Sequence, residues 1–120
     1  MKKTILIIED DEYIRDSLAE LLETEGYTVN VAFNGEEGMN ALRTQGKPSL
    51  ILLDLMMPIK DGFQFREEQL QDPSFSQIPV VIMSAHGNIK ENRERTGALA
   101  YLKKPIDIDE VLKTVEKYVS

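Results

Sequence analysis

The sequence predicts an α/β domain in which helices cover both faces of a mostly parallel sheet. Short apolar segments alternate five times with segments of helical character, which is the pattern of βαβ crossovers. The central apolar segment, Leu50–Leu53, has four apolar residues in a row between turn signals, which is typical of a strand buried on both faces. The predicted architecture is therefore a three-layer, doubly wound α/β sandwich.

Two strand–helix units make up the first half of the chain. The apolar run Thr4–Ile8 is the first strand, and Glu12–Glu25 is the first helix because its apolar residues recur at helical spacing. Gly26 lies where a helix C-cap is expected. The second strand is Tyr27–Ala32. Asn34 caps the second helix, with a glutamate three residues later as in a capping box.

The second half of the chain continues the alternation after the central strand. The third helix is expected at Gly62–Leu70, followed by an Asp-Pro pair that closes it. The fourth and fifth strands are expected at Pro79–Met83 and Leu99–Leu102. A last helix opens at Asp107, which has a glutamate three residues later and so predicts another capping box.

The segment Asn88–Thr96 fits the helical pattern poorly. Its position is that of the fourth helix, yet Ile89 is its only apolar residue. A helix here can bury little apolar surface, so we expect it to be short or mobile.

Composition narrows the classes of function. A chain of 120 residues without a linker or repeat predicts one domain spanning residues 1–120. The formal charge of −7, from 14 Lys+Arg and 21 Asp+Glu, disfavours direct binding of nucleic acid. The absence of cysteine excludes disulfides, thiolate catalysis and cysteine-based zinc sites. The first apolar run stops at Glu9, too soon for a signal peptide, and no segment approaches a membrane span, so a cytoplasmic location is expected.

Polar residues follow the ends of four of the predicted strands. In chain order they are Glu9 with Asp10, Asp54, Ser84 and Lys104. The carboxyl ends of parallel strands share one edge of the sheet, where open α/β domains bind their ligands. Each residue alone has an ordinary alternative as a solvated turn, a strand terminator or a helix-entry turn. Their joint placement at one edge favours a functional site.

Three carboxylates at this edge predict a bound cation. At ~5 Å each pair would repel by about 3 kcal/mol at an effective dielectric near 20, and raised pKa values or a cation would relieve this. Oxygen ligands without His or Cys suit Mg²⁺. With Lys104 and the Ser84 hydroxyl added, the site is complementary to a phosphoryl group on Asp54, whose carboxylate can act as a nucleophile.

Taken together, these motifs resemble the receiver domain of response regulators, the CheY-like superfamily of two-component signalling, over essentially the whole chain. The matching features are the acidic pair Glu9-Asp10, the turn Asp54-Leu-Met-Met-Pro58 followed by Gly62, Ser84-Ala85, and Tyr101-Leu-Lys-Lys104-Pro105. The resemblance implies a (βα)5 fold whose five parallel strands take the flavodoxin-like order 2-1-3-4-5. It also implies a phosphoacceptor switch with an unknown downstream protein, and not an enzyme with a separate substrate.

The resemblance further implies a role for each matching residue of the phosphorylation site. Asp54 would accept a phosphoryl group from a histidine kinase or a histidine phosphotransfer protein. Mg²⁺, or Mn²⁺ in its place, would be held by Asp54, by Asp10 directly, by Glu9 through water and by the backbone carbonyl of Met56. Lys104 would contact the phosphate.

Other matching positions concern signal transmission and phosphoryl lifetime. Ser84 would be the switch hydroxyl, and Tyr101 the switch aromatic whose ring turns inward when that hydroxyl moves. Met56 and His86 match positions that flank the phosphoryl group. Met56 cannot orient an attacking water by hydrogen bonding, so slow hydrolysis is expected; His86 could do so, or could be an ordinary surface loop residue.

The chain departs from the family between Ser84 and Lys104, where it is shorter than most receivers. The loss falls in Asn88–Thr96, part of the surface that family members use for output or dimerisation. The output partner, the cognate kinase, the pathway and the oligomeric state therefore stay open. So does the choice between a stand-alone regulator and a receiver cut from a larger protein.

Three other functions were compared with this one. A pseudo-receiver that recruits a partner without phosphorylation would not need the complete set of site residues. A phosphatase of the haloacid-dehalogenase class has an aspartate two residues after its nucleophile, where this chain has Met56. A flavodoxin binds phosphate after its first strand, where Glu9-Asp10-Asp11 would repel it unless a metal intervened.

Overall fold

Five apolar segments pair side by side into one parallel sheet. The computed structural model describes residues 3–85 and 89–119. The strands are Thr4–Ile8 (β1), Thr28–Ala32 (β2), Leu50–Asp54 (β3), Val80–Ser84 (β4) and Ala100–Lys103 (β5). Their spatial order is β2-β1-β3-β4-β5, with every neighbouring pair parallel. The predicted doubly wound architecture and strand order are confirmed.

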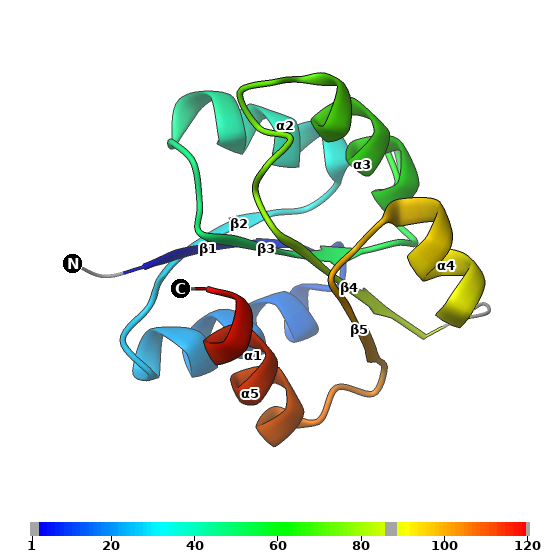
Figure 1. Cartoon of the computed structure of the whole chain (residues 1–120). Coiled ribbons are helices and arrows are strands. Elements are labelled where there is room, and N and C mark those ends of the chain that lie inside the picture. Colours follow the sequence, from blue (N-terminus) through cyan, green and yellow to red (C-terminus); the bar gives the residue numbers. More distant parts are fainter. Residues whose placement is uncertain (1–2, 86–88, 120) are drawn as a thin grey trace.

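Five helices alternate with the strands. They are Glu12–Thr24 (α1), Gly35–Thr44 (α2), Gly62–Gln71 (α3), Ile89–Thr96 (α4) and Ile108–Tyr118 (α5). Helices α1 and α5 cover one face of the sheet, and α2 and α3 cover the other, with α4 beside α3 near β5 (Figure 1). In the described part of the chain, none of these helices has the length and apolar character needed to cross a bilayer.

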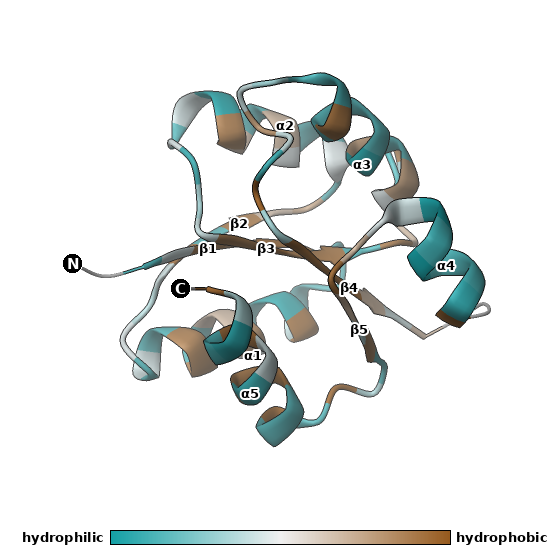
Figure 2. Cartoon of the chain, in the orientation of Figure 1, coloured by the Kyte–Doolittle hydropathy of each residue, from teal (hydrophilic) through white to brown (hydrophobic). Residues whose placement is uncertain are grey.

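The core lies on both faces of the sheet because successive strand side chains point to opposite faces. All five residues of β3 are buried, and the strands form the most apolar layer of the molecule (Figure 2). Ile5, Ile7 and Leu52 pack with residues of α1 and α5. Leu6, Ile8 and Leu53 pack with residues of α2 and α3.

Acidic or amide side chains begin four of the helices. Asp11, Asn34, Asp61 and Asp107 each accept a hydrogen bond from the backbone N–H three residues later. The caps predicted at Asn34 and Asp107 are therefore present, but in the described part of the chain neither has the return bond from its glutamate that would complete the predicted capping box. At Asp61 the Gln64 side chain also bonds back to the cap, a complete capping box that the sequence analysis missed.

Helix α4 is short, as its composition predicted. It has eight residues, of which Thr96 is buried, and Ile89 is 43% exposed. Asn88, the first residue of the expected segment, lies outside the described residues, and the expected mobility stays a prediction.

Polar contacts from α3 hold the C-terminal end of α4. Arg66 donates from Nε to the Thr96 carbonyl at 2.8 Å and from Nη2 to the Gly97 carbonyl at 3.4 Å. It also donates from Nη1 to Gln69 at 2.8 Å. The Arg95 guanidinium stacks 3.8 Å from the centroid of the Phe63 ring. These contacts take the place of the apolar packing that α4 lacks.

The loop between β3 and α3 contains a strained turn at Ile59. Its φ is 69°, and the Lys60 N–H donates to the Pro58 carbonyl at 2.8 Å across it, as in a γ-turn. A left-handed conformation is costly for a β-branched residue. The turn is held in place because the Gly35 N–H donates to the Lys60 carbonyl at 2.8 Å and the Lys60 ammonium pairs with Glu68.

Replacing Ile59 by glycine should raise the free energy of unfolding by about 1 kcal/mol. Relief of the left-handed strain stabilises the folded state by roughly 1–2 kcal/mol. The greater conformational entropy of glycine stabilises the unfolded chain and offsets part of this gain. Urea unfolding of both proteins measures the difference. Ile59→Ala keeps the strained Cβ and should show no such gain. A glycine variant less stable than the parent would contradict the strain.

Candidate functional site

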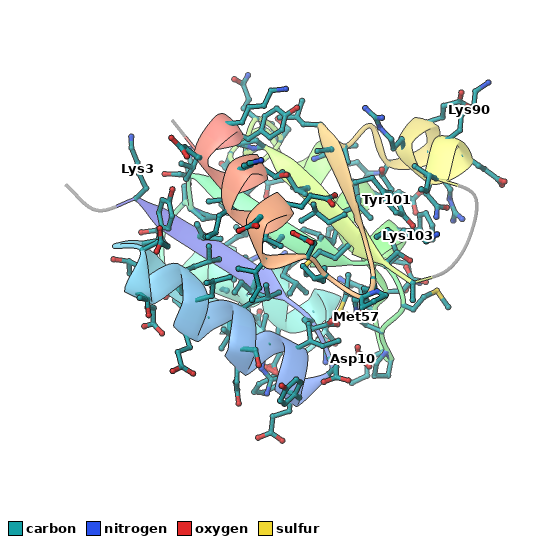
Figure 3. The ribbon with its side chains drawn as sticks, turned by 90° about the horizontal axis from the view of Figure 1, so that it is seen from below. Lys3, Asp10, Met57, Lys90, Tyr101 and Lys103 are labelled. Carbon is teal, nitrogen blue, oxygen red and sulfur yellow. The ribbon has the colours of Figure 1, made fainter. Side chains whose placement is uncertain are left out.

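Three carboxylates meet at the carboxyl ends of β1 and β3, the point where the strand order reverses. Ile8 pairs with Leu53 in the sheet, so Glu9 and Asp54 leave it as neighbours. Glu9, Asp10 and Asp54 each offer an oxygen, and these oxygens lie within 4.8 Å of one another. Glu9 and Asp54 are buried, whereas Asp10 is exposed beyond the end of β1 (Figure 3). The three predicted carboxylates thus form one cluster.

Lys104 reaches this cluster from the loop after β5. Its ammonium pairs with Oε1 of Glu9 and lies 3.4 Å from Oδ1 of Asp54. Burial lowers the pKa of Lys104, but the two carboxylates outweigh this and hold the pKa above its ordinary value. The backbone fixes the residue as well, since the Lys104 N–H donates to the Ser84 carbonyl at 2.9 Å.

Glu9 is the most deeply buried carboxylate of the cluster. Its side chain is fully buried, and Oε2 has no hydrogen-bond partner within the described residues. Burial, and after it the neighbouring Asp54, raise the pKa of Glu9 to about 7 despite the opposing effect of Lys104. An unsatisfied carboxylate oxygen among other carboxylates is a donor set suited to a hard divalent cation. The residues present therefore fit Mg²⁺.

A cleft opens over these groups. Its volume is about 200 Å³, and it is lined by Asp10, Asp11, Ile14, Asp54, Met56, Ala85 and Lys104. Met56 therefore lies at the cleft and is 59% exposed, and the metal-binding role of its carbonyl stays a prediction.

Gly62 makes room for this arrangement. Its N–H donates to the Leu55 carbonyl at 3.0 Å. A Cβ at this position would lie 2.4 Å from the Asp54 carbonyl oxygen. Only glycine therefore allows the first residue of α3 to pack directly against the backbone of Asp54 and Leu55.

The predicted switch residues lie on the neighbouring strands. Ser84 ends β4, next to β3, and is buried. Tyr101 is half-buried on β5, opposite Ile82, and packs against the core on the α2–α3 face. The movement of the Ser84 hydroxyl and the Tyr101 ring on phosphorylation stays a prediction. His86 lies outside the described residues, so its influence on phosphoryl lifetime stays a prediction.

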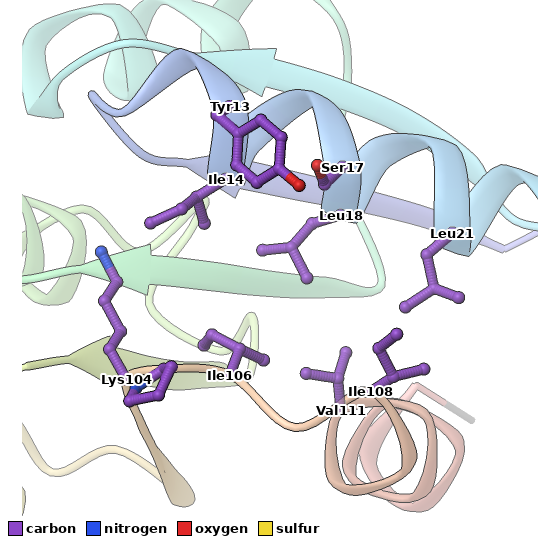
Figure 4. A pocket seen from close by; sticks show the side chains of 10 residues that line it. Tyr13, Ile14, Ser17, Leu18, Leu21, Lys104, Ile106, Ile108 and Val111 are labelled. Carbon is purple, nitrogen blue, oxygen red and sulfur yellow. The ribbon is translucent and has the colours of Figure 1, made fainter.

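An apolar groove beside the cleft was not predicted from the sequence. It lies between α1 and the start of α5, with a volume of about 290 Å³ (Figure 4). Tyr13 and Ile108 line it and are 81% and 60% exposed. Lys104 lines both the groove and the cleft. Two exposed apolar side chains far apart in sequence gave no signal of a shared surface.

Glu9→Gln should flatten the pH dependence of stability in metal-free buffer. Because folding raises the pKa of Glu9 to about 7, the folded chain holds a proton that the unfolded chain releases. Stability therefore falls as pH rises from the unfolded value to about 7, and then levels off. Between pH 5 and pH 8 the stability of Glu9→Gln relative to the parent should rise by roughly 1–3 kcal/mol.

Urea unfolding with EDTA at several pH values measures this effect. Glu12→Gln, which removes an exposed carboxyl of α1, is the matched control and should follow the parent. Equal pH profiles for Glu9→Gln and the parent would show that Glu9 titrates normally.

The chain was compared with known proteins. The family model of the response regulator receiver domain matches residues 5–116. The chain is 37% identical to sporulation initiation phosphotransferase F of Bacillus subtilis, over 99% of this chain and 95% of that protein. It is 37% identical to PilH of Pseudomonas aeruginosa, over 92% and 93%. It is also 42% identical to the DNA-binding dual master transcriptional regulator RpaA of Synechocystis, over 92% of this chain but only 46% of that protein.

Solved structures agree with these relatives. A putative response regulator from Chloroflexus aurantiacus superposes with a TM-score of 0.90 at 27% identity, covering 99% of this chain and 98% of that one. The receiver domain of the Francisella response regulator 1452 gives a TM-score of 0.87 at 29% identity, covering 98% and 97%. The chain therefore belongs to the response regulator receiver domain family of two-component signalling.

Proposed function

We propose that the chain is a phosphoacceptor switch in which Asp54 takes a phosphoryl group in a Mg²⁺-dependent reaction. The donor is a histidine kinase or a histidine phosphotransfer protein, and the phosphorylated chain presents a changed surface to a downstream protein. One observation carries the proposal: Asp54 lies at a cleft between two further carboxylates and the ammonium of Lys104. The chain acts on no separate substrate.

The reaction uses the Asp54 carboxylate as nucleophile. One of its oxygens attacks the phosphorus of a phosphohistidine, and the P–N bond breaks as the P–O bond forms. The donor imidazole leaves with the bonding electrons and takes up a proton. Lys104, 3.4 Å from Oδ1 of Asp54, is placed to neutralise an oxygen of the transferred group.

The divalent cation would be held by Glu9, Asp10, Asp54 and the Met56 carbonyl. When bound, it neutralises charge on the phosphoryl oxygens. Two observations support this assignment: the buried, unpartnered Oε2 of Glu9 within the described residues, and the three-carboxylate cluster.

The comparisons support a phosphotransfer partner. The Bacillus subtilis relative, which matches along nearly its whole length, is named a phosphotransferase. Residues 1–120 are proposed to act as one receiver domain in the cytoplasm, with Ser84 and Tyr101 as the pair that responds to phosphorylation. The net charge of −7 accords with a protein partner and not with direct binding of nucleic acid by this domain.

Incubation with acetyl phosphate and Mg²⁺ should add one phosphate to the intact mass. Asp54→Asn should show no adduct, because its side chain is no longer a nucleophile. Asp11→Asn is the matched control: asparagine also caps helices, so α1 keeps its start and the adduct should form. If the parent chain stays unmodified and a beryllofluoride mimic does not bind either, the results would instead favour a phosphate-independent binding module.

Lys104→Gln should slow this phosphorylation by roughly tenfold or more, because a preorganised charge near the reacting oxygens is lost. Lys103→Gln, which changes the exposed lysine one residue earlier, should react like the parent. Rates come from a time course of intact mass at saturating Mg²⁺. Equal rates for the two variants would show that Lys104 does not assist the phosphorylation of Asp54.

A further inference from the structure

A buried arginine lies behind the acidic turn. Arg15 of α1 is 9% exposed, and its Nη1 donates to the Glu9 carbonyl at 3.2 Å. Its guanidinium lies 4.5 Å from the centroid of the Phe33 ring. Its Nε also lies 3.8 Å from Oδ1 of the exposed Asp16, a long ion pair at the surface. Arginine is seldom buried unless its charge is paired, and the proposed phosphorylation chemistry assigns Arg15 no role.

The contacts of Arg15 involve the main chain of Glu9 and not its carboxylate. Oε1 of Glu9 pairs with Lys104, while Oε2 has no hydrogen-bond partner in the described part of the chain. The main chain of Glu9 is held twice, since its N–H also donates to the Ala32 carbonyl at 3.0 Å. Arg15 therefore fixes the direction in which the backbone leaves β1.

The other side of the turn is fixed as firmly. The Asp11 side chain accepts from the Ile14 N–H at 3.0 Å, and its carbonyl accepts from the Arg15 N–H at 2.9 Å. Asp10 stands between these two anchored residues with an exposed carboxylate. The direction of that carboxylate is thus set by the backbone on either side of it.

We propose that Arg15 is a positioning residue for the cation site. By holding the Glu9 carbonyl it aims the Asp10 carboxylate at the oxygens of Glu9 and Asp54. Mg²⁺ demands near-ideal octahedral geometry, and groups that orient metal ligands strongly affect metal affinity. This inference rests on the proposed Mg²⁺ site and adds a residue to it that does not touch the metal.

The test is calorimetric titration with MgCl₂ alone, without any phosphodonor. Arg15→Met keeps much of the side chain that packs near Phe33 but loses the donor, and its Kd for Mg²⁺ should rise by roughly tenfold or more. Arg15→Lys retains one donor group and should recover part of the affinity. Should Arg15→Met fail to fold, Arg15→Gln takes its place, because its amide nitrogen ends two bonds short of the Nη1 that contacts Glu9. An unchanged Kd in Arg15→Gln would overturn the proposal.

Arg66→Met provides the matched control. Arg66 is also 9% exposed and also donates to backbone carbonyls, but those carbonyls belong to the end of α4. Its variant should lose stability in urea while keeping the parent Kd for Mg²⁺. If Arg15→Met does the same, Arg15 is merely structural and the inference is wrong. A parent chain that binds no Mg²⁺ would reject the proposed cation site and this inference with it.

Discussion

The functional site depends on one constraint: the parallel sheet holds three carboxylates close together against their mutual repulsion. Because β1 and β3 run side by side in the same direction, Glu9 and Asp54 leave the sheet as neighbours, and chain connectivity brings Asp10 with them. In water such groups would move apart. Here the backbone prevents that, and the repulsion is relieved in part by Lys104 and in part by the raised pKa of Glu9, which favours its protonated form.

The surrounding elements keep the carboxylates from relaxing. Gly62 lets α3 start against the backbone of Asp54, and the strained turn at Ile59 is tied to the start of α2 and to Glu68. Arg15 acts on the opposite side, at the backbone of Glu9. Local strain that surrounding contacts maintain is typical of functional sites. Here the rigidity of the cleft comes from such contacts on either side.

Much of this could be predicted from sequence because the relevant signals are local. A buried parallel strand is a continuous apolar run, and its carboxyl end is the next residue. Knowing the strands is therefore enough to bring Glu9, Asp54 and Lys104 to one edge. Arg15 and Gln69 could not be predicted in this way, because helical spacing alone does not distinguish a buried polar side chain from a solvated one. Their partners, such as Phe33 and the Ile78 carbonyl, become visible only when distant segments meet.

The polar attachment of α4 sets how the molecule can change shape. Apolar cores on both faces of the sheet join it to the other helices, so displacing any of these helices exposes core surface to water. Helix α4 shares little of that core and is held at its C-terminal end by the hydrogen bonds of Arg66. Few apolar contacts oppose the separation of this helix, so we predict that opening it costs less free energy than disrupting the core. We therefore predict conformers that differ in α4 while the core on both faces of the sheet stays intact, and a ligand with a modest preference among them would redistribute their populations.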